Sequence, residues 1–179
     1  MALAIAGALS ARADLTLVDI NTPVAGSKTT NADGSFTVVA GGGDTWDSVD
    51  SFTYVYEERT GDFDVQVQVV DLVVGDPSQQ DSAKASLMVR AGLTPGAANI
   101  QVSALPLDSK DAIETIYRPK ADAGTDDMPD RPTGNTSPRG TTPYPNVFLR
   151  VRRVGNNFTT YYSNKATEWT VLSSVTVDP

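Results

Sequence analysis

The side chains that could do chemistry in this chain are acids, arginines, lysines, hydroxyls and aromatic rings, because its 179 residues include no histidine and no cysteine. Without imidazole or thiol, the chain cannot form Ser-His or Cys-His nucleophile pairs, thiolate or iron–sulfur ligation, or disulfides. The formal net charge is −8, and an acidic surface repels phosphate backbones. We therefore expect no nucleic-acid partner, and we expect any site to use oxygen ligands, guanidinium groups or aromatic rings.

Two acidic stretches have the composition of a calcium site, since calcium takes six to eight oxygen ligands. They read DTWDSVD at 44–50 and DAGTDDMPD at 122–130. The candidate ligands are Asp44, Asp47, Asp50, Asp122, Asp126, Asp127 and Asp130. Neither stretch matches the EF-hand pattern, and a solvated acidic loop explains the same residues. Both interpretations stay open from the sequence.

A third acidic pattern, DFD at 62–64, places Asp62 and Asp64 on one face of an expected strand. Glycoside hydrolysis normally needs two carboxylates that flank the scissile bond. Alternation with Phe63 and Val65 already explains the two acids as a solvated face. We therefore expect the protein not to be an enzyme.

Aromatic side chains supply the remaining chemistry. In SFTYVYE at 51–57, Phe52, Tyr54 and Tyr56 share one face of an expected strand. Such a stripe either packs in a core or, if exposed, stacks against the apolar C–H faces of sugar rings. The candidate ligand-binding residues are Trp46, Tyr54, Tyr56, Tyr161 and Trp169, with Arg90 and Arg150 as polar partners. The arginines, Arg152 included, serve equally well as ion-pair partners for Asp64 and other acids.

Short β-rich runs separated by turn residues must position these side chains. In FDVQVQV at 63–69, Phe63, Val65, Val67 and Val69 alternate with polar residues, which is typical of a strand with one buried face. AKASLMVR at 83–90 and VFLRVRRV at 147–154 alternate in the same way, and no segment has a sustained helical period. The pattern predicts one all-β domain over residues 14–179, built as an antiparallel sandwich or jelly roll of two sheets.

Two segments do not follow this pattern. Residues 1–13, MALAIAGALSARA, resemble a secretory signal cleaved after Ala13, but they also alternate as a strand that could be donated to another copy. The run is too short to span a bilayer. Residues 118–146 hold six of the 11 prolines, so we expect one long surface loop there.

The ordered set of motifs over residues 15–177 resembles a known family. The stretches that carry the resemblance are GGGDTWDSVDSFTYVYEERTGDFDVQVQV, AKASLMVRAGL and FLRVRRVGNNFTTYYS, with Trp169 after them. They are similar to the laminin-G-like domains of the concanavalin A-like lectin/glucanase superfamily, in the bacterial subgroup labelled regulation of enolase protein. The resemblance implies a two-sheet jelly roll and loop-rim calcium sites. The Glu-x-Asp-x-x-Glu motif of the superfamily's glucanases is missing here.

The chain departs from that family in two places. Lys165-Ala166 stands where members usually have an Asp-Gly turn before the tryptophan. Members also continue past SSVTVDP with further strands. The resemblance therefore implies either that this sequence is a fragment or that it leaves a sheet edge open, and such an edge is a template for pairing.

Together these observations predict a secreted or cell-surface recognition module without catalytic activity, with carbohydrate as its partner. The alternative is a structural subunit of an extracellular filament or surface layer, which self-associates by adding its N-terminal strand to an open sheet edge.

Overall fold

The computed structural model describes residues 15–80, 82–106, 112–127 and 142–178. These residues form an all-β protein, as predicted, with one short 3₁₀ turn at Pro77–Gln79 and no α-helix in the described part. The strands are β1 (Thr16–Ile20), β2 (Ser27–Thr30), β3 (Phe36–Val39), β4 (Phe52–Tyr56), β5 (Phe63–Val69), β6 (Ala85–Arg90), β7 (Asn99–Ala104), β8 (Ile113–Arg118), β9 (Asp126–Asp127), β10 (Val147–Val154), β11 (Asn157–Ser163) and β12 (Thr170–Thr176).

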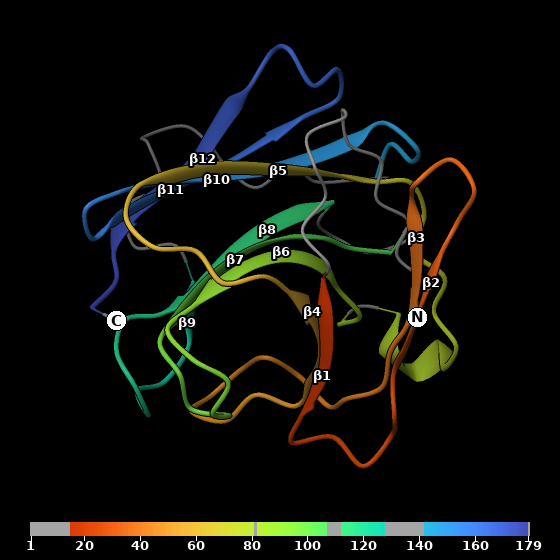
Figure 1. Cartoon of the computed structure of the whole chain (residues 1–179), viewed down its shortest axis with the longest axis horizontal. Coiled ribbons are helices and arrows are strands. Elements are labelled where there is room, and N and C mark those ends of the chain that lie inside the picture. Colours follow the sequence, from red (N-terminus) through yellow and green to blue (C-terminus); the bar gives the residue numbers. More distant parts are fainter. Residues whose placement is uncertain (1–14, 81, 107–111, 128–141, 179) are drawn as a thin grey trace.

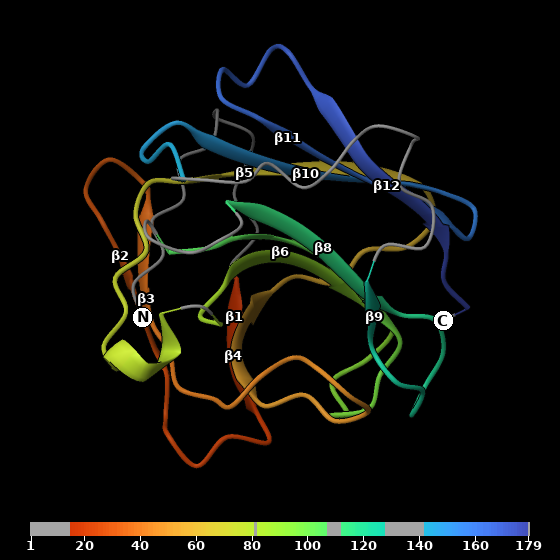
Figure 2. The ribbon, with the colours of Figure 1, turned by 180° about the vertical axis from the view of Figure 1, so that it is seen from behind.

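Two four-stranded antiparallel sheets form the body of the molecule (Figure 1). The upper sheet has the strand order β12-β11-β10-β5, and the lower sheet has the order β6-β7-β8-β9. β10 packs over β6 and β7, while β12 packs over β8. The view from behind shows β8 lying beneath the upper sheet in the same way (Figure 2).

Alternation places the core between these two sheets. Val147, Leu149 and Val151 of β10 are at most 1% exposed and face the lower sheet. Val67 and Val69 of β5 are also buried, in register with Leu149 and Val147. The prediction that one face of β5 is buried is therefore confirmed for Val67 and Val69, while Phe63 and Val65 are only partly buried.

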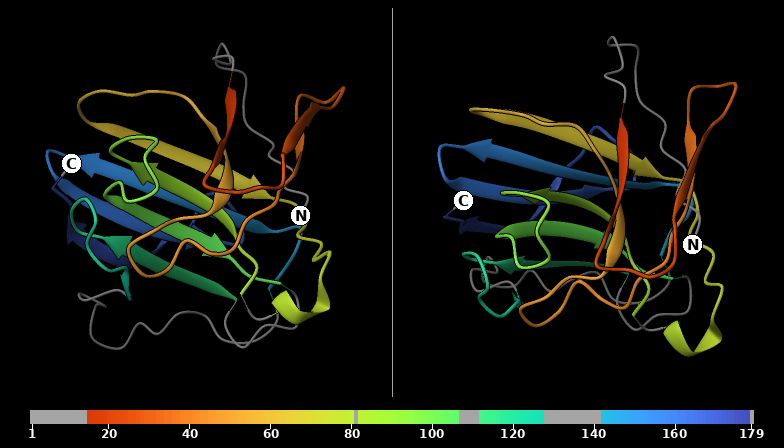
Figure 3. Two further views of the ribbon diagram at one scale, coloured as in Figure 1. Left: turned by 90° about the horizontal axis from the view of Figure 1, so that it is seen from below. Right: turned by 60° about the horizontal axis from the view of Figure 1, so that its bottom comes forward.

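Two-stranded ribbons add to the predicted pair of sheets. β1 pairs with β4, and β2 pairs with β3. The β1–β4 ribbon lies on the side of the lower sheet away from the upper sheet (Figure 1). Both ribbons stand across the direction of the sheet strands (Figure 3).

The face of the lower sheet that points away from the upper sheet is also covered. The alternation in AKASLMVR predicts that the face with Lys84, Ser86, Met88 and Arg90 meets solvent. Met88 is 7% exposed, however, and Gln101 on the neighbouring strand is 1% exposed. Alternation identifies which residues share a face, and it does not show what covers that face. Here the chain between β3 and β4 covers it, since Thr45 Oγ1 accepts a 2.7 Å hydrogen bond from Gln101 Nε2.

The predicted loop at 118–146 begins as regular structure. Arg118 is the last residue of β8, and Asp126–Asp127 form β9 beside it. At the other end, Thr142 is buried, and its hydroxyl donates to the carbonyl of Leu105 at 2.8 Å. The N-terminal segment 1–13 lies outside the described residues. Among the described elements there is no helix with the length and apolar character that crossing a membrane requires.

Candidate functional site

The first acidic stretch does not form a cluster of carboxylates. Asp50 is fully buried, and its side chain forms ion pairs with two arginines. Oδ2 accepts from Nη1 of Arg90 and from Nη1 of Arg118, both at 2.9 Å, and Oδ1 accepts from Nη2 of Arg118 at 2.7 Å. Asn99 Nδ2 adds a longer contact at 3.4 Å. We call Asp50, Arg90 and Arg118 the ion hub.

The ion hub holds three loops against the lower sheet. Arg118 donates to the carbonyls of Asp47, Ala97 and Ala123 at 3.0–3.1 Å. Its guanidinium is 0% exposed, so every donor must find a partner inside the protein. The carboxylate of Asp50 therefore neutralises buried cations and is not available to an ion in this structure.

The other candidate calcium ligands are separated. Asp44 pairs with Lys84 at 3.1 Å, while Asp47 contributes its main-chain carbonyl to Arg118 and Thr125. Asp122 and Asp126 belong to the turn after β8 and to β9, and the side chain of Asp127 and all of Asp130 lie outside the description. No three acidic side chains gather into a potential metal site among the described residues.

The aromatic stripe on β4 is intact and partly exposed. Phe52 and Tyr54 have ring centroids 5.6 Å apart, and Tyr54 and Tyr56 stack at 5.4 Å with an interplanar angle of 8°. Arg90 lies 5.2 Å from the ring centre of Phe52. The hydroxyl of Tyr54 donates to the main-chain carbonyl of Met88 at 3.1 Å. The stripe therefore lies against the edge of the lower sheet.

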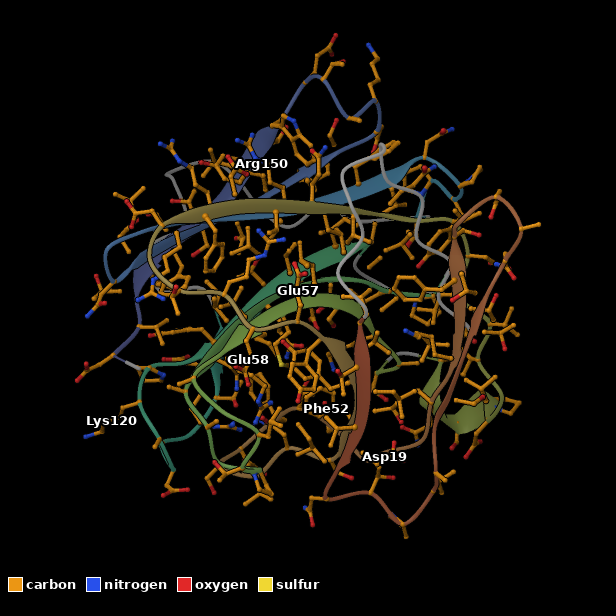
Figure 4. All side chains as sticks on the ribbon, in the orientation of Figure 1. Asp19, Phe52, Glu57, Glu58, Lys120 and Arg150 are labelled. Atoms are coloured by element: carbon orange, nitrogen blue, oxygen red, sulfur yellow. The ribbon has the colours of Figure 1, made fainter. Side chains whose placement is uncertain are left out.

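The stripe forms one wall of a large open cleft, which we call the aromatic cleft. Its volume is about 1140 Å³, and it lies between β3, β4, β5 and β6. Apolar lining comes from Phe36, Phe63, Val65, Leu87 and Val89. Polar lining comes from Asp44, Glu57, Glu58, Arg59, Gln66, Gln79, Lys84 and Gln101. Figure 4 shows Phe52, Glu57 and Glu58 on the inner side of the upper sheet, away from Arg150.

Burial in this wall changes the acidity of one tyrosine. Desolvation raises the pKa of Tyr54 from 10.0 to about 12, while the nearby Arg90 lowers it in part. The hydroxyl of Tyr54 is therefore a neutral hydrogen-bond donor at every physiological pH. Glu57 and Arg59 at the rim form an ion pair, with Arg59 Nε donating to Glu57 Oε1 at 2.6 Å.

Two strands that line the cleft have an unpaired edge. Within the described residues, β5 pairs only with β10, and β6 pairs only with β7. Directly after β6, the main-chain NH of Ala91 donates to the main-chain carbonyl of Ala98. Alternate residues of an antiparallel strand direct their NH and C=O groups to the same side, so the odd-numbered residues of β6 direct theirs toward β7. Ser86, Met88 and Arg90 therefore direct their main-chain groups away from β7, on the side of β6 that lines the cleft.

The remaining predicted residues lie elsewhere. Arg150 projects from the outer face of the upper sheet, 4.8 Å from the ring centre of Tyr161 and 5.3 Å from that of Trp169. Its guanidinium also donates to Asp64, with Nε and Oδ1 2.7 Å apart. Trp46 is 41% exposed on the loop between β3 and β4. The structure thus divides the predicted ligand-binding set between the cleft, this outer face and, for Trp46, an exposed loop.

Several residues of the site are not among those predicted from sequence. Arg118 stands at the start of the predicted loop at 118–146, and Glu57 and Glu58 directly follow the aromatic stripe. No local pattern identifies them, because the cleft is made by segments far apart in the chain. No protein-family model, curated protein or solved structure matches this chain.

Proposed function

We propose that this protein is a non-catalytic extracellular recognition module that binds carbohydrate in the aromatic cleft, on a jelly-roll sandwich of the laminin-G type. The observation that carries the proposal is the Phe52–Tyr54–Tyr56 wall in a cleft of about 1140 Å³. Sugar-binding sites combine ring faces, which take the apolar C–H side of a pyranose, with a few polar groups that take its hydroxyls.

The cleft offers both kinds of group. Tyr56, at the end of the stripe, stacks against Tyr54 with one face of its ring. Glu57 and Glu58 supply acceptors around it, and Arg59 and Lys84 supply donors. Acidic and basic lining residues are balanced: Asp44, Glu57, Glu58 and Asp76 accompany Arg59, Lys84, Arg90 and Arg153. That balance favours a neutral glycan over a strongly charged one.

The absence of catalysis and the extracellular location are parts of the same proposal. The Asp64 carboxylate of the DFD pattern is bound to Arg150, and Asp62 accepts the main-chain NH of Gly155 at 2.8 Å, so both acids have structural partners. Export is supported by the signal-like composition of residues 1–13.

A glycan array followed by calorimetry tests the proposal. A neutral oligosaccharide that binds the wild type should bind Tyr56→Ala about tenfold more weakly, because truncating an aromatic anchor typically costs more than about 1 kcal/mol. Trp46→Ala, on the exposed loop between β3 and β4 and outside the cleft lining, is the matched control and should retain affinity. Equal loss in both variants, or loss in neither, would reject the cleft as the site.

A second candidate function is self-assembly by strand addition, and the unpaired edges of β5 and β6 favour it. An added strand would bond to an exposed edge and bury the partly exposed Leu87 and Val89. The candidate donor is the alternating segment at residues 2–9, and Leu15, six residues after its end in the chain, lines the cleft.

Deletion of residues 1–13 separates the two candidates. Under strand addition, the deletion abolishes the polymers that electron microscopy and light scattering detect, and it opens the cleft to glycan. If assembly is the same with and without the segment, strand donation by residues 2–9 is excluded, whereas the glycan proposal is unaffected.

A further inference from the structure

The outer face of the upper sheet carries a second group of binding side chains, separate from the aromatic cleft. Cross-strand register places Gln66, Arg150 and Tyr161 in one row, and Asp64, Arg152 and Thr159 in the next. Arg150 lies on the far side of the sheet from Phe52 and the cleft (Figure 4). The two surfaces can therefore be altered independently.

The charge on this face is locally positive on a protein of net charge −8. Arg150 and Asp64 neutralise one another through their paired hydrogen bonds. Arg152, directly across from Asp64, is exposed, and its charge adds to the Arg150 hydrogen bond in lowering the pKa of the Asp64 carboxyl. Arg150, Arg152 and Asp64 together make two cations and one anion, so one positive charge is left uncompensated and open to solvent.

Arg150 also fixes the aromatic rings beside that cation. Its guanidinium lies over the rings of both Tyr161 and Trp169. The ion pair with Asp64 fixes the position of this guanidinium, and the guanidinium in turn fixes the two rings. Arg152 and Tyr161 are diagonal neighbours on adjacent strands, a separation of roughly 7–8 Å that one pyranose ring can bridge. A pocket of about 370 Å³ opens beside Trp169, with Lys165 and Glu168 in its lining.

We propose that the outer face of the upper sheet binds a sugar that carries a single carboxylate, with the carboxylate on Arg152 and the ring against Tyr161 and Trp169. A guanidinium matches a carboxylate in two parallel hydrogen bonds. One uncompensated cation suits one carboxylate per ligand, whereas a densely charged polyanion would meet the negative charge of the rest of the protein. The inference rests on carbohydrate recognition as the function but uses a different surface.

Two methyl glycosides that differ only at C6 test it: methyl β-glucuronide and methyl β-glucoside. The chain has two tryptophans, so the indole NH signal of Trp169 reports the outer face and that of Trp46 is the internal reference. We expect the glucuronide to shift the Trp169 signal and to bind roughly 1.5- to 5-fold more tightly than the glucoside, as one exposed ion pair allows.

Arg152→Gln should remove that preference, whereas Lys120→Gln, which deletes an equal charge at the exposed Lys120 of Figure 4, should keep it. Equal titration of the two glycosides with the wild type overturns the proposal, and so does a preference that survives Arg152→Gln. Tyr56→Ala leaves this titration unchanged even if the cleft binds nothing, so the two proposals fail separately.

Discussion

Replacing Asp50 by asparagine should destabilise the protein strongly, because it removes the only anion of the ion hub. Asp50 is 0% exposed and accepts three hydrogen bonds of 2.7–2.9 Å from Arg90 and Arg118. The variant keeps the shape of the side chain but leaves two buried guanidinium groups without a counterion. Breaking a buried ion pair on one side costs about 3–5 kcal/mol.

Urea unfolding followed by tryptophan fluorescence measures this free energy of unfolding, and thermal unfolding gives a second estimate. A loss of this size lowers Tm by roughly 6–20 °C for a chain of this length. Asp44→Asn is the matched control, since Asp44 is 46% exposed and pairs with Lys84, and it should change stability by less than about 1 kcal/mol. If Asp50→Asn costs no more than Asp44→Asn, the hub does not hold the loops as described.

Three other predictions concern pH and the core. The pKa of Tyr54 is raised above its ordinary value of 10.0, so the stability that comes from its neutral form is present below pH 10 and is lost as pH rises toward 12. Tyr54→Phe should flatten that alkaline loss in urea titrations. Arg150 lowers the pKa of Asp64, so the stability contributed by the ionised Asp64 carboxylate is present above about pH 3.8 and is lost as the pH falls below that value. If the stability of the wild type is no more sensitive to acid than that of Asp64→Asn, this prediction is wrong. Thr115 and Thr160 share a buried 2.9 Å hydrogen bond, so Thr115→Val should cost about 1–3 kcal/mol, and adding Thr160→Val should recover part of it, as a double-mutant cycle would show.

The strands themselves were predictable from sequence because their signals are local. The alternation in VFLRVRRV predicts β10 over Val147–Val154, and its inward residues Val147, Leu149 and Val151 are buried. The Gly155 turn between β10 and β11 has a positive φ of 60°, which glycine adopts without strain. The two-residue hydrophobic period predicts the strand and its buried face, and the glycine predicts the turn that follows it.

The site was only partly predictable because it depends on contacts between distant segments. Asp50, Arg90 and Arg118 form one hub from three separate parts of the chain, and no spacing rule connects them. Asp50 looked like a calcium ligand because its acidic neighbours are close in sequence, yet its nearest charges in space are arginines. The sequence pattern predicts the aromatic stripe, but the cleft beside it is lined by β3, β5 and β6 as well as β4, which come from separate parts of the chain.

The most direct test of the aromatic cleft is ring NMR of the protein labelled at its six tyrosines, titrated with a neutral oligosaccharide that binds it. The proposed function predicts that the ring signals of Tyr54 and Tyr56 shift with the same affinity as binding, while that of Tyr144 stays in place. Tyr54 and Tyr56 signals that are unchanged at saturation would contradict it.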